Sequence, residues 1–328
     1  MPTLLVLLCV LLTVRLALGA EPQTPLYPPM TVPFVEIVQD GQPRCAIVPA
    51  AETGKAGEWA AQQVKTYLRK MSGADVSIVN TPEAGAFPIR IVRDKALAEE
   101  QLRIRCDGKE VALAGGGDRG VMYAAAAFVE ECLGVRWFMP TDWGEVVPRS
   151  ATIRVGQFDR AEQPDFPLRW IGSGDWAAFN RLNAGLPVAE VKVALPGHTF
   201  DHTIPPDKYF REHPDWFAYH RETQRRRQTQ WCTSNPALLA EVVKNMRAIL
   251  DADPEIRVIG LCPNDGTGFC ECDECAKLDE PGRPSVVDIN QRYVQLGDER
   301  RGALTRRFLI FFNQVARGMR ESHPNVIV

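Results

Sequence analysis

The alternation of predicted strands and helices that begins near residue 160 constrains the fold more than any other feature of the sequence. Beyond it, short apolar runs that predict strands alternate with segments of helical period. The expected strands are 168–171, 190–195, 229–233, 257–262 and 325–328, and the expected helices are 176–182, 236–250 and 304–322. Strands alternating with helices favour a parallel sheet, with functional side chains at the carboxyl ends of its strands.

The length of this second part predicts an open arrangement. A closed barrel of eight strand–helix units takes roughly 250 residues, whereas 168 residues follow position 160. We therefore expect residues 160–328 to form the first part of an incomplete (β/α)8 barrel of the TIM type. Catalytic groups on later strands would then lie outside this sequence.

Residues 34–155 predict a small α+β domain. Asp40-Gly41 and Asp107-Gly108 are strong hairpin turns, and helical periods over 57–71 and 119–133 each end at a glycine. Two helices on a mainly antiparallel sheet would account for this pattern. The chain as a whole is thus expected to be of the α/β class, a small α+β domain followed by the barrel.

The amino-terminal end and the charge limit localisation and partners. Residues 1–20 carry an apolar run of signal-peptide length, too short to span a membrane, and residues 21–33 form a proline-rich linker. We expect a secreted or periplasmic protein with no membrane span after signal removal. A net charge of −3 does not favour nucleic acid as a partner.

Two groups of segments resemble known families. AAETGKAGEWAAQQVKTYLRKMSGADVSIV and GDRGVMYAAAAFVEECLGVRWFMPTDWGEVVP resemble the N-terminal domain of α-glucuronidases and related bacterial glycosidases, a hexosaminidase-type domain. HPDWFAYHRETQRRRQTQWCTSNPALLAEVV and IGLCPNDGTGFCECDECAKLD resemble a large secreted bacterial family of unknown function, allied to glycoside hydrolases. Together they cover most of residues 34–328, and CPNDGTGFCECDEC is the most specific part.

The resemblance implies a carbohydrate-active protein. Its expected reaction is hydrolysis of O-glycosidic bonds in a polysaccharide or glycan, with a uronide as one option, and its partner is the carbohydrate substrate. Two other interpretations stay open: a non-catalytic carbohydrate-binding surface protein on a degenerate barrel, and a metal-stabilised scaffold. Barrels support many chemistries, so the residues must discriminate between them.

Asp265 is the first catalytic candidate. It follows the apolar run 258–261, where a barrel strand would deliver a side chain to the active face. Glycoside hydrolysis usually requires two carboxylates, and Asp201, Asp175 or a group from a later strand could be the second. Asn264-Asp265-Gly266 equally suits a simple turn, because these residue types favour turn geometry for local reasons.

Several polar and aromatic residues are candidates for sugar contact. His198 and His202 flank Asp201 in a glycine- and proline-rich loop, where sugar contact, a structural role and metal binding are all open. Arginine can clamp a uronate carboxylate, and tryptophan can stack on a sugar or simply fill a core. The other candidates are Arg169, Trp170, Trp176, Asn180, Arg181, Trp231 and Asn264.

Cys270-x-Cys272-x-x-Cys275 is the sharpest local motif. With Cys232 or Cys262 it could supply four thiolates to a structural Zn²⁺. Export to an oxidising compartment instead favours disulfides that staple the loop, and redox chemistry is a third option. Apart from this zinc, no cofactor is required.

Overall fold

The computed structural model describes residues 33–279 and 304–328 and divides into two compact units, the first ending at Glu190 and the second beginning at Val191. The expected signal peptide over 1–20 and all but the last residue of the 21–33 linker lie outside the described residues. Over the two described ranges, no helix is both long and apolar enough to cross a membrane.

The first unit is built on a five-stranded sheet. Its order is β10-β5-β6-β4-β3, with bounds Phe158–Glu162, Leu102–Cys106, Val111–Gly115, Phe87–Arg93 and Cys45–Pro49. The β3–β4 and β4–β6 pairs are parallel, and the β6–β5 and β5–β10 pairs are antiparallel. The expectation of a mainly antiparallel sheet is wrong, because the 19-residue helix between β3 and β4 makes a crossover that brings β4 back parallel to β3.

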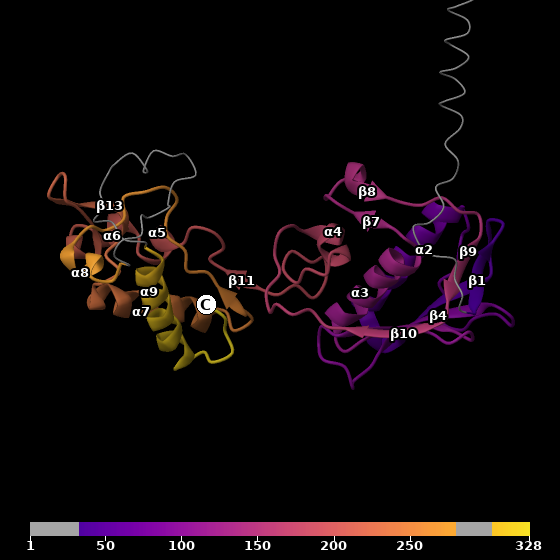
Figure 1. Cartoon of the computed structure of the whole chain (residues 1–328). Helices are drawn as coiled ribbons and strands as arrows, with labels where there is room; N and C mark the ends of the chain where they lie inside the picture. The colour runs from indigo at the N-terminus through magenta and orange to yellow at the C-terminus, as the bar shows by residue number, and fades with distance from the viewer. Residues whose placement is uncertain (1–32, 280–303) are drawn as a thin grey trace, which may run out of the picture. The chain divides into compact units, whose positions relative to one another are not determined.

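Two helices, α2 (Gly54–Ser72) and α3 (Asp118–Ala127), pack against each other and against this sheet (Figure 1). The expected helix over 57–71 is confirmed, and Gly73 ends it in the left-handed conformation with φ of 80°. Helix α3 continues as a π-helical turn, Phe128–Cys132. Every residue from Gly120 to Ala127 is buried, so α3 has no solvent-facing side along that length.

The predicted hairpin turns are confirmed. Asp40 and Gly41, with φ of 49° and 74°, join β1 (Phe34–Gln39) to β2 (Gln42–Pro43), and β9 (Ile153–Gly156) completes this three-stranded sheet. Asp107-Gly108 lies in the turn between β5 and β6. A further short hairpin pairs β7 (Arg136–Trp137) with β8 (Glu145–Val146).

Residues 160–190 belong to the first unit, although the sequence places the second domain's start near 160. Helix α4 (Gly174–Phe179) buries Ala177, Ala178 and Phe179 in the core that α2 and α3 share. The Phe179 ring stacks on Trp137 with 4.2 Å between centroids. The strand expected over 168–171 does not form.

The second unit contains a short parallel arrangement. Strand β11 (Val193–Ala194) pairs in parallel with β14 (Val258–Ile259), and a single parallel bridge joins Ile327 to Val258. The strand expected over 229–233 falls largely in β13 (Arg225–Trp231), which pairs antiparallel with β12 (Phe217–His220). Within residues 191–279 and 304–328 these strands form no closed barrel.

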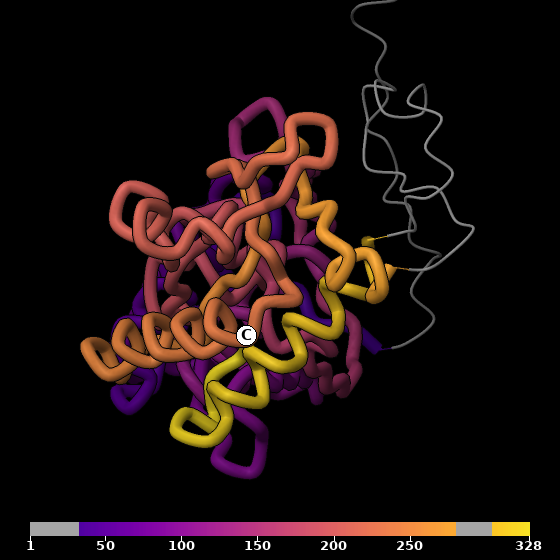
Figure 2. The backbone as a smooth tube through the Cα atoms, turned by 90° about the vertical axis from the view of Figure 1, so that its left-hand side faces the viewer, coloured from indigo at the N-terminus to yellow at the C-terminus, as the bar shows by residue number. Residues whose placement is uncertain are grey.

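Five helices complete the described part of the second unit: α5 (Phe200–Thr203), α6 (Pro206–Tyr209), α7 (Pro236–Ala252), α8 (Asp273–Ala276) and α9 (Thr305–Arg320). Helices α7 and α9 lie side by side (Figures 1 and 2), joined by an Arg247–Glu321 ion pair at 2.7 Å. As the sequence predicts, Asn235 caps α7: its Oδ1 accepts hydrogen bonds from two backbone amides of the first turn. Phe200 stacks on Trp231 in the core.

Candidate functional site

The loops that follow β11 and β14 are packed closely together. Thr199 N donates to the Cys262 carbonyl at 3.0 Å, and Cys262 N donates to Thr199 Oγ1 at 2.8 Å. A Cβ atom on Gly260 would lie 2.1 Å from the Leu195 carbonyl oxygen, so only glycine permits this approach. Two loops from the carboxyl ends of neighbouring parallel strands therefore form one surface, as the sequence leads us to expect.

Asp201 and Asn264 meet across these loops. Asn264 Nδ2 donates to Asp201 Oδ1 at 2.7 Å and to the Thr229 carbonyl at 3.0 Å. Asp201 N donates in return to Asn264 Oδ1 at 3.3 Å. The Asp201 side chain is exposed, but the hydrogen bond from Asn264 Nδ2 holds its carboxylate.

Asp265 is exposed beside this pair. Its Oδ1 accepts a hydrogen bond from Gly266 N at 2.8 Å, and Gly266 adopts φ of 88°. This contact is the local turn that the residue types predict. Asp265 stays exposed, so the turn orients the side chain without burying it.

His198 lies in the loop after β11 and His202 lies in the short helix α5 that follows it, and both are exposed. His198 Nδ1 is 2.8 Å from the Pro263 carbonyl, so Nδ1 donates its proton to that oxygen. The strand-end group, defined here as His198, Asp201, His202, Asn264 and Asp265, thus gathers five of the predicted site residues.

Gln230 and Thr199 support this group, and neither is among the residues expected from sequence. The Gln230 amide is buried; its Nε2 donates to the Asn264 carbonyl at 2.7 Å and its Oε1 accepts from Asn264 N at 3.2 Å. A glutamine next to Trp231 within the predicted strand 229–233 is the sequence signal that could have identified it.

Six other predicted site residues belong to the first unit. Arg169 directs its guanidinium to Glu100 at 2.8 Å, Tyr123 Oη at 3.0 Å and two backbone carbonyls. Arg181 pairs with Glu130 at 2.7 Å and with Glu131 at 3.4 Å. Both guanidinium groups are therefore already engaged by protein acceptors.

The other four are placed as follows. Asp175 accepts hydrogen bonds from Trp59 Nε1 at 2.8 Å and Gln63 Nε2 at 3.4 Å. Trp176 Nε1 and Asn180 Nδ2 both donate to the Trp137 carbonyl, while Trp170 is half exposed. In the second unit, Trp231 is buried and stacks on Phe200, so it is a core residue.

The second unit also holds a four-cysteine cluster, defined as Cys232, Cys270, Cys272 and Cys275. All four Sγ atoms lie within 4.8 Å of one another. Cys232 follows β13, Cys272 caps α8 and Cys275 lies within it. Cys262 is outside the cluster. This proximity is compatible with a bound metal ion, as the sequence motif suggests.

Donors surround the sulfur atoms. Tyr219 N donates to Cys270 Sγ at 3.3 Å, and Arg226 Nη1 lies 3.6 Å from the same atom. Ser234 Oγ is 3.2 Å from Cys275 Sγ. Hydrogen bonding within the cluster lowers the pKa of Cys232 to about 6 and also lowers the pKa of Cys272. Hydrogen bonds within the cluster, together with burial, raise the pKa of Cys270 and of Cys275, so these contacts favour the thiolate at two of the four sulfurs.

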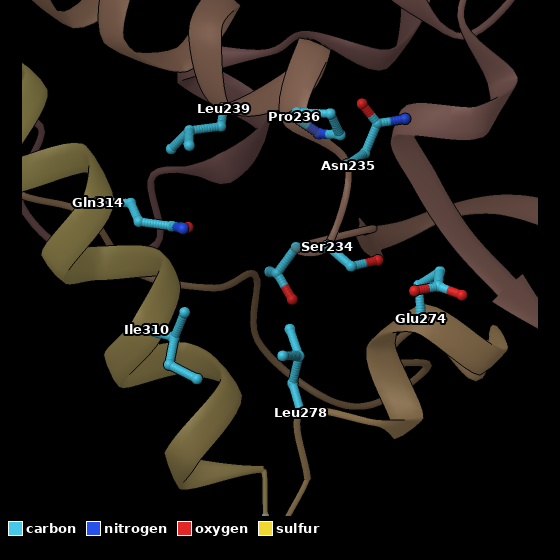
Figure 3. A pocket seen from close by; sticks show the side chains of 9 residues that line it. Ser234, Asn235, Pro236, Leu239, Glu274, Leu278, Ile310 and Gln314 are labelled. Atoms are coloured by element: carbon cyan, nitrogen blue, oxygen red, sulfur yellow. The ribbon is translucent and has the colours of Figure 1, made fainter.

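A pocket of about 270 Å³ opens beside the cluster. Ser234 and Leu278 point into it from loops, Leu239 comes from α7, and Ile310 and Gln314 come from α9 (Figure 3). Polar and apolar side chains both line the pocket, and none of them belongs to the strand-end group.

Comparison with known proteins finds no curated protein that matches. Among solved structures, the GH20 exo-β-N-acetylglucosaminidase of Vibrio harveyi has 15% identity and a TM-score of 0.33, over 51% of this chain and 25% of its own. A GH115 4-O-methyl-α-glucuronidase with specificity for decorated arabinogalactans has 17% identity and a TM-score of 0.35, over 43% and 20%. A GH138 enzyme that targets pectin rhamnogalacturonan II has 12% identity and a TM-score of 0.30, and the match covers 84% of this chain and 30% of that enzyme.

This chain spans less than a third of the length of each of these three enzymes. At the level of families, residues 139–328 match the model described as Domain of unknown function (DUF4838). The match covers more than half of the 328 residues, including the strand-end group and the four-cysteine cluster. The chain therefore belongs to the DUF4838 family.

Proposed function

We propose that this protein is carbohydrate-active and that the strand-end group binds a glycan and contributes to hydrolysis of its O-glycosidic bonds. The observation that carries the proposal is the Asp201–Asn264 contact, at 2.7 Å, which joins the loops after two parallel strands. Two exposed carboxylates, Asp201 and Asp265, and two exposed histidines follow these same strands in the chain, which supports the proposal.

The chemistry of this surface suits a sugar. Glycoside hydrolysis needs one carboxyl group to protonate the leaving oxygen and another to act as base or nucleophile. Asp265 and Asp201 are the proposed pair, and Asn264 is a positioning residue that holds Asp201. His198 and His202 would donate to or accept from sugar hydroxyl groups.

A non-catalytic glycan-binding role is the second candidate. The exposure of Asp201 and Asp265 favours it, because a carboxyl group that must stay protonated as a general acid usually needs an apolar setting. The two candidates differ in turnover and agree in predicting that the surface binds carbohydrate.

The test uses the full chain against a panel of aryl glycosides and uronides, together with glycan-array binding. Asp265→Asn and Asp201→Asn are compared with Asp207→Asn, a matched control in α6 of the same unit. We expect turnover to fall at least about 100-fold in the first two variants and to stay unchanged in the control.

Three outcomes are informative. Turnover that falls in a still-folded Asp265→Asn variant supports hydrolysis at this surface. Glycan binding without turnover, weakened by Asp201→Asn, supports the second candidate and contradicts hydrolysis. Neither binding nor turnover on any glycan would contradict both.

We also infer that the four-cysteine cluster is structural. It is largely buried, with Cys275 fully covered, and it holds the same loop that carries Asn264 and Asp265. A rigid cross-link at this point restricts the motion of the loop and so supports the geometry of the strand-end group.

A further inference from the structure

We propose that Cys232, Cys270, Cys272 and Cys275 bind one Zn²⁺ ion in a closed tetrahedral site. This inference goes beyond the glycan function and does not depend on it. It rests on the spacing of the sulfur atoms, on the donors around them, and on the separation of Cys262 from the group.

The sulfur spacing fits a tetrahedron around zinc. With Zn–S bonds of about 2.3 Å, the edge of an ideal tetrahedron of sulfurs is about 3.8 Å. Cys232 Sγ lies 3.7 Å from Cys272 Sγ and 3.9 Å from Cys275 Sγ, and no pair exceeds 4.8 Å. Small side-chain adjustments would therefore close all four ligands on one ion.

The same spacing does not match disulfides. A bonded S–S pair is about 2.05 Å long, and the eight cysteines of the described ranges are all unpaired. Two disulfides would divide the four sulfurs into two bonded pairs. Here Cys232 is instead almost equally distant from two partners, which is the arrangement of ligands around a common centre.

Donor groups around the cluster compensate the negative charge that remains after four thiolates bind one Zn²⁺. Four thiolates and one Zn²⁺ together carry a net negative charge. Arg226 approaches Cys270 Sγ at 3.6 Å, and the buried Arg307 donates from Nη1 to the Cys270 carbonyl at 2.7 Å. Tyr219 N and Ser234 Oγ add uncharged donors to the sulfurs. Such outer contacts orient thiolate ligands and strengthen metal binding.

The ligand set selects the metal and its role. Four soft sulfur ligands suit zinc and leave no place for the oxygen-preferring Mg²⁺ or Ca²⁺. All four positions are protein side chains, so no coordination position remains for water or substrate. The site would join the end of β13, the loop after β14 and helix α8.

Metal analysis of the full chain, purified without chelator, tests the proposal directly. We expect one zinc per chain. After exchange into Co²⁺, we expect the intense sulfur-to-cobalt absorption and visible d–d bands of a tetrahedral tetrathiolate site. This readout needs neither catalytic activity nor a glycan, so its outcome is separate from that of the proposed function.

Variants locate the ion. Cys232→Ser and Cys275→Ser should lower zinc content severalfold and weaken the cobalt bands. Cys262→Ser is the matched control, because Cys262 lies in the same loop outside the cluster, and it should retain one zinc. If the cluster variants fail to fold, the wild-type chain still tests the proposal. The four cluster thiols should react with a thiol reagent only after strong chelation.

Two results would overturn the proposal. The first is a folded wild-type chain, grown with ample zinc, that contains no metal and yields disulfide-linked peptides joining these cysteines. The second is one zinc per chain that Cys262→Ser removes and Cys232→Ser does not.

Discussion

Replacing Asp279 by alanine is expected to destabilise helix α9 more than any surface substitution. Arg307, near the start of α9, has a side chain only 4% exposed, and its Nε donates to Asp279 Oδ1 at 2.6 Å. Without Asp279 the guanidinium stays charged and buried, with the Cys270 carbonyl as a remaining acceptor. Removing one partner of such a pair costs about 3–5 kcal/mol. Since one hydrogen bond survives, we expect a loss at the lower end of that range, about 3 kcal/mol.

The assay is native-state hydrogen exchange on the full chain, read by mass spectrometry on peptides of α9. The matched control is Glu321→Gln, which breaks the Arg247–Glu321 pair just beyond the same helix. Glu321 has 74% of its side chain exposed, so this loss should be under about 1 kcal/mol.

A double variant distinguishes the cost of an unpaired buried charge from the contribution of the Arg307–Asp279 ion pair itself. Arg307→Met with Asp279→Leu removes both charges and replaces the ion pair with apolar side chains, so it should recover most of the stability lost in Asp279→Ala. If Asp279→Ala lowers the opening free energy of α9 by no more than Glu321→Gln does, the reasoning from burial is refuted.

Two further predictions concern stability. Asn235→Ala should cost about 1–2 kcal/mol, because α7 loses the acceptor of two first-turn amides, whereas Asn235→Asp should cost less; equal urea midpoints for both variants would contradict this. Burial alone would raise the pKa of Glu145, but hydrogen bonds from Lys70 and Tyr67 outweigh it and lower that pKa. The stability advantage of wild type over Glu145→Gln should therefore be complete above the unfolded pKa of about 4.3 and disappear as the pH falls through the lower folded value, which urea unfolding at several pH values would check.

Local signals in the sequence predicted the elements that depend on local chemistry. The Asp40-Gly41 and Asp107-Gly108 turns formed where expected because their backbone conformations suit few other residues. Helix α7 begins at its predicted cap, Asn235, because the asparagine side chain accepts hydrogen bonds from two first-turn amides. The rule that parallel strands present their ends together predicted Asp201 and Asp175 as neighbours of Asp265. Asp201 does contact the adjacent Asn264, whereas Asp175 belongs to the first unit.

Contacts between residues far apart in the sequence could not be predicted from such local signals. Residues 229–233 are expected from sequence to form a barrel strand, yet the strand there pairs with the antiparallel β12, and sequence carries no direct record of pairing partners. Arg169 and Arg181 suggested a uronate clamp, but Glu100 and Glu130, far away in sequence, occupy them. The choice of Cys232 over Cys262 likewise depends on tertiary placement.

The burial of α3 on all sides has a consequence for cooperativity. Its alanines Ala124–Ala127 are covered by the sheet and α2 together with residues from beyond position 160, and Tyr123 Oη donates to the Leu182 carbonyl at 2.7 Å. An amphipathic helix can form on a single layer, whereas this one needs every layer in place before its apolar surface is shielded. The first unit should therefore fold in one all-or-none transition that includes residues 160–190, and a fragment ended at residue 155 would leave its central helix uncovered.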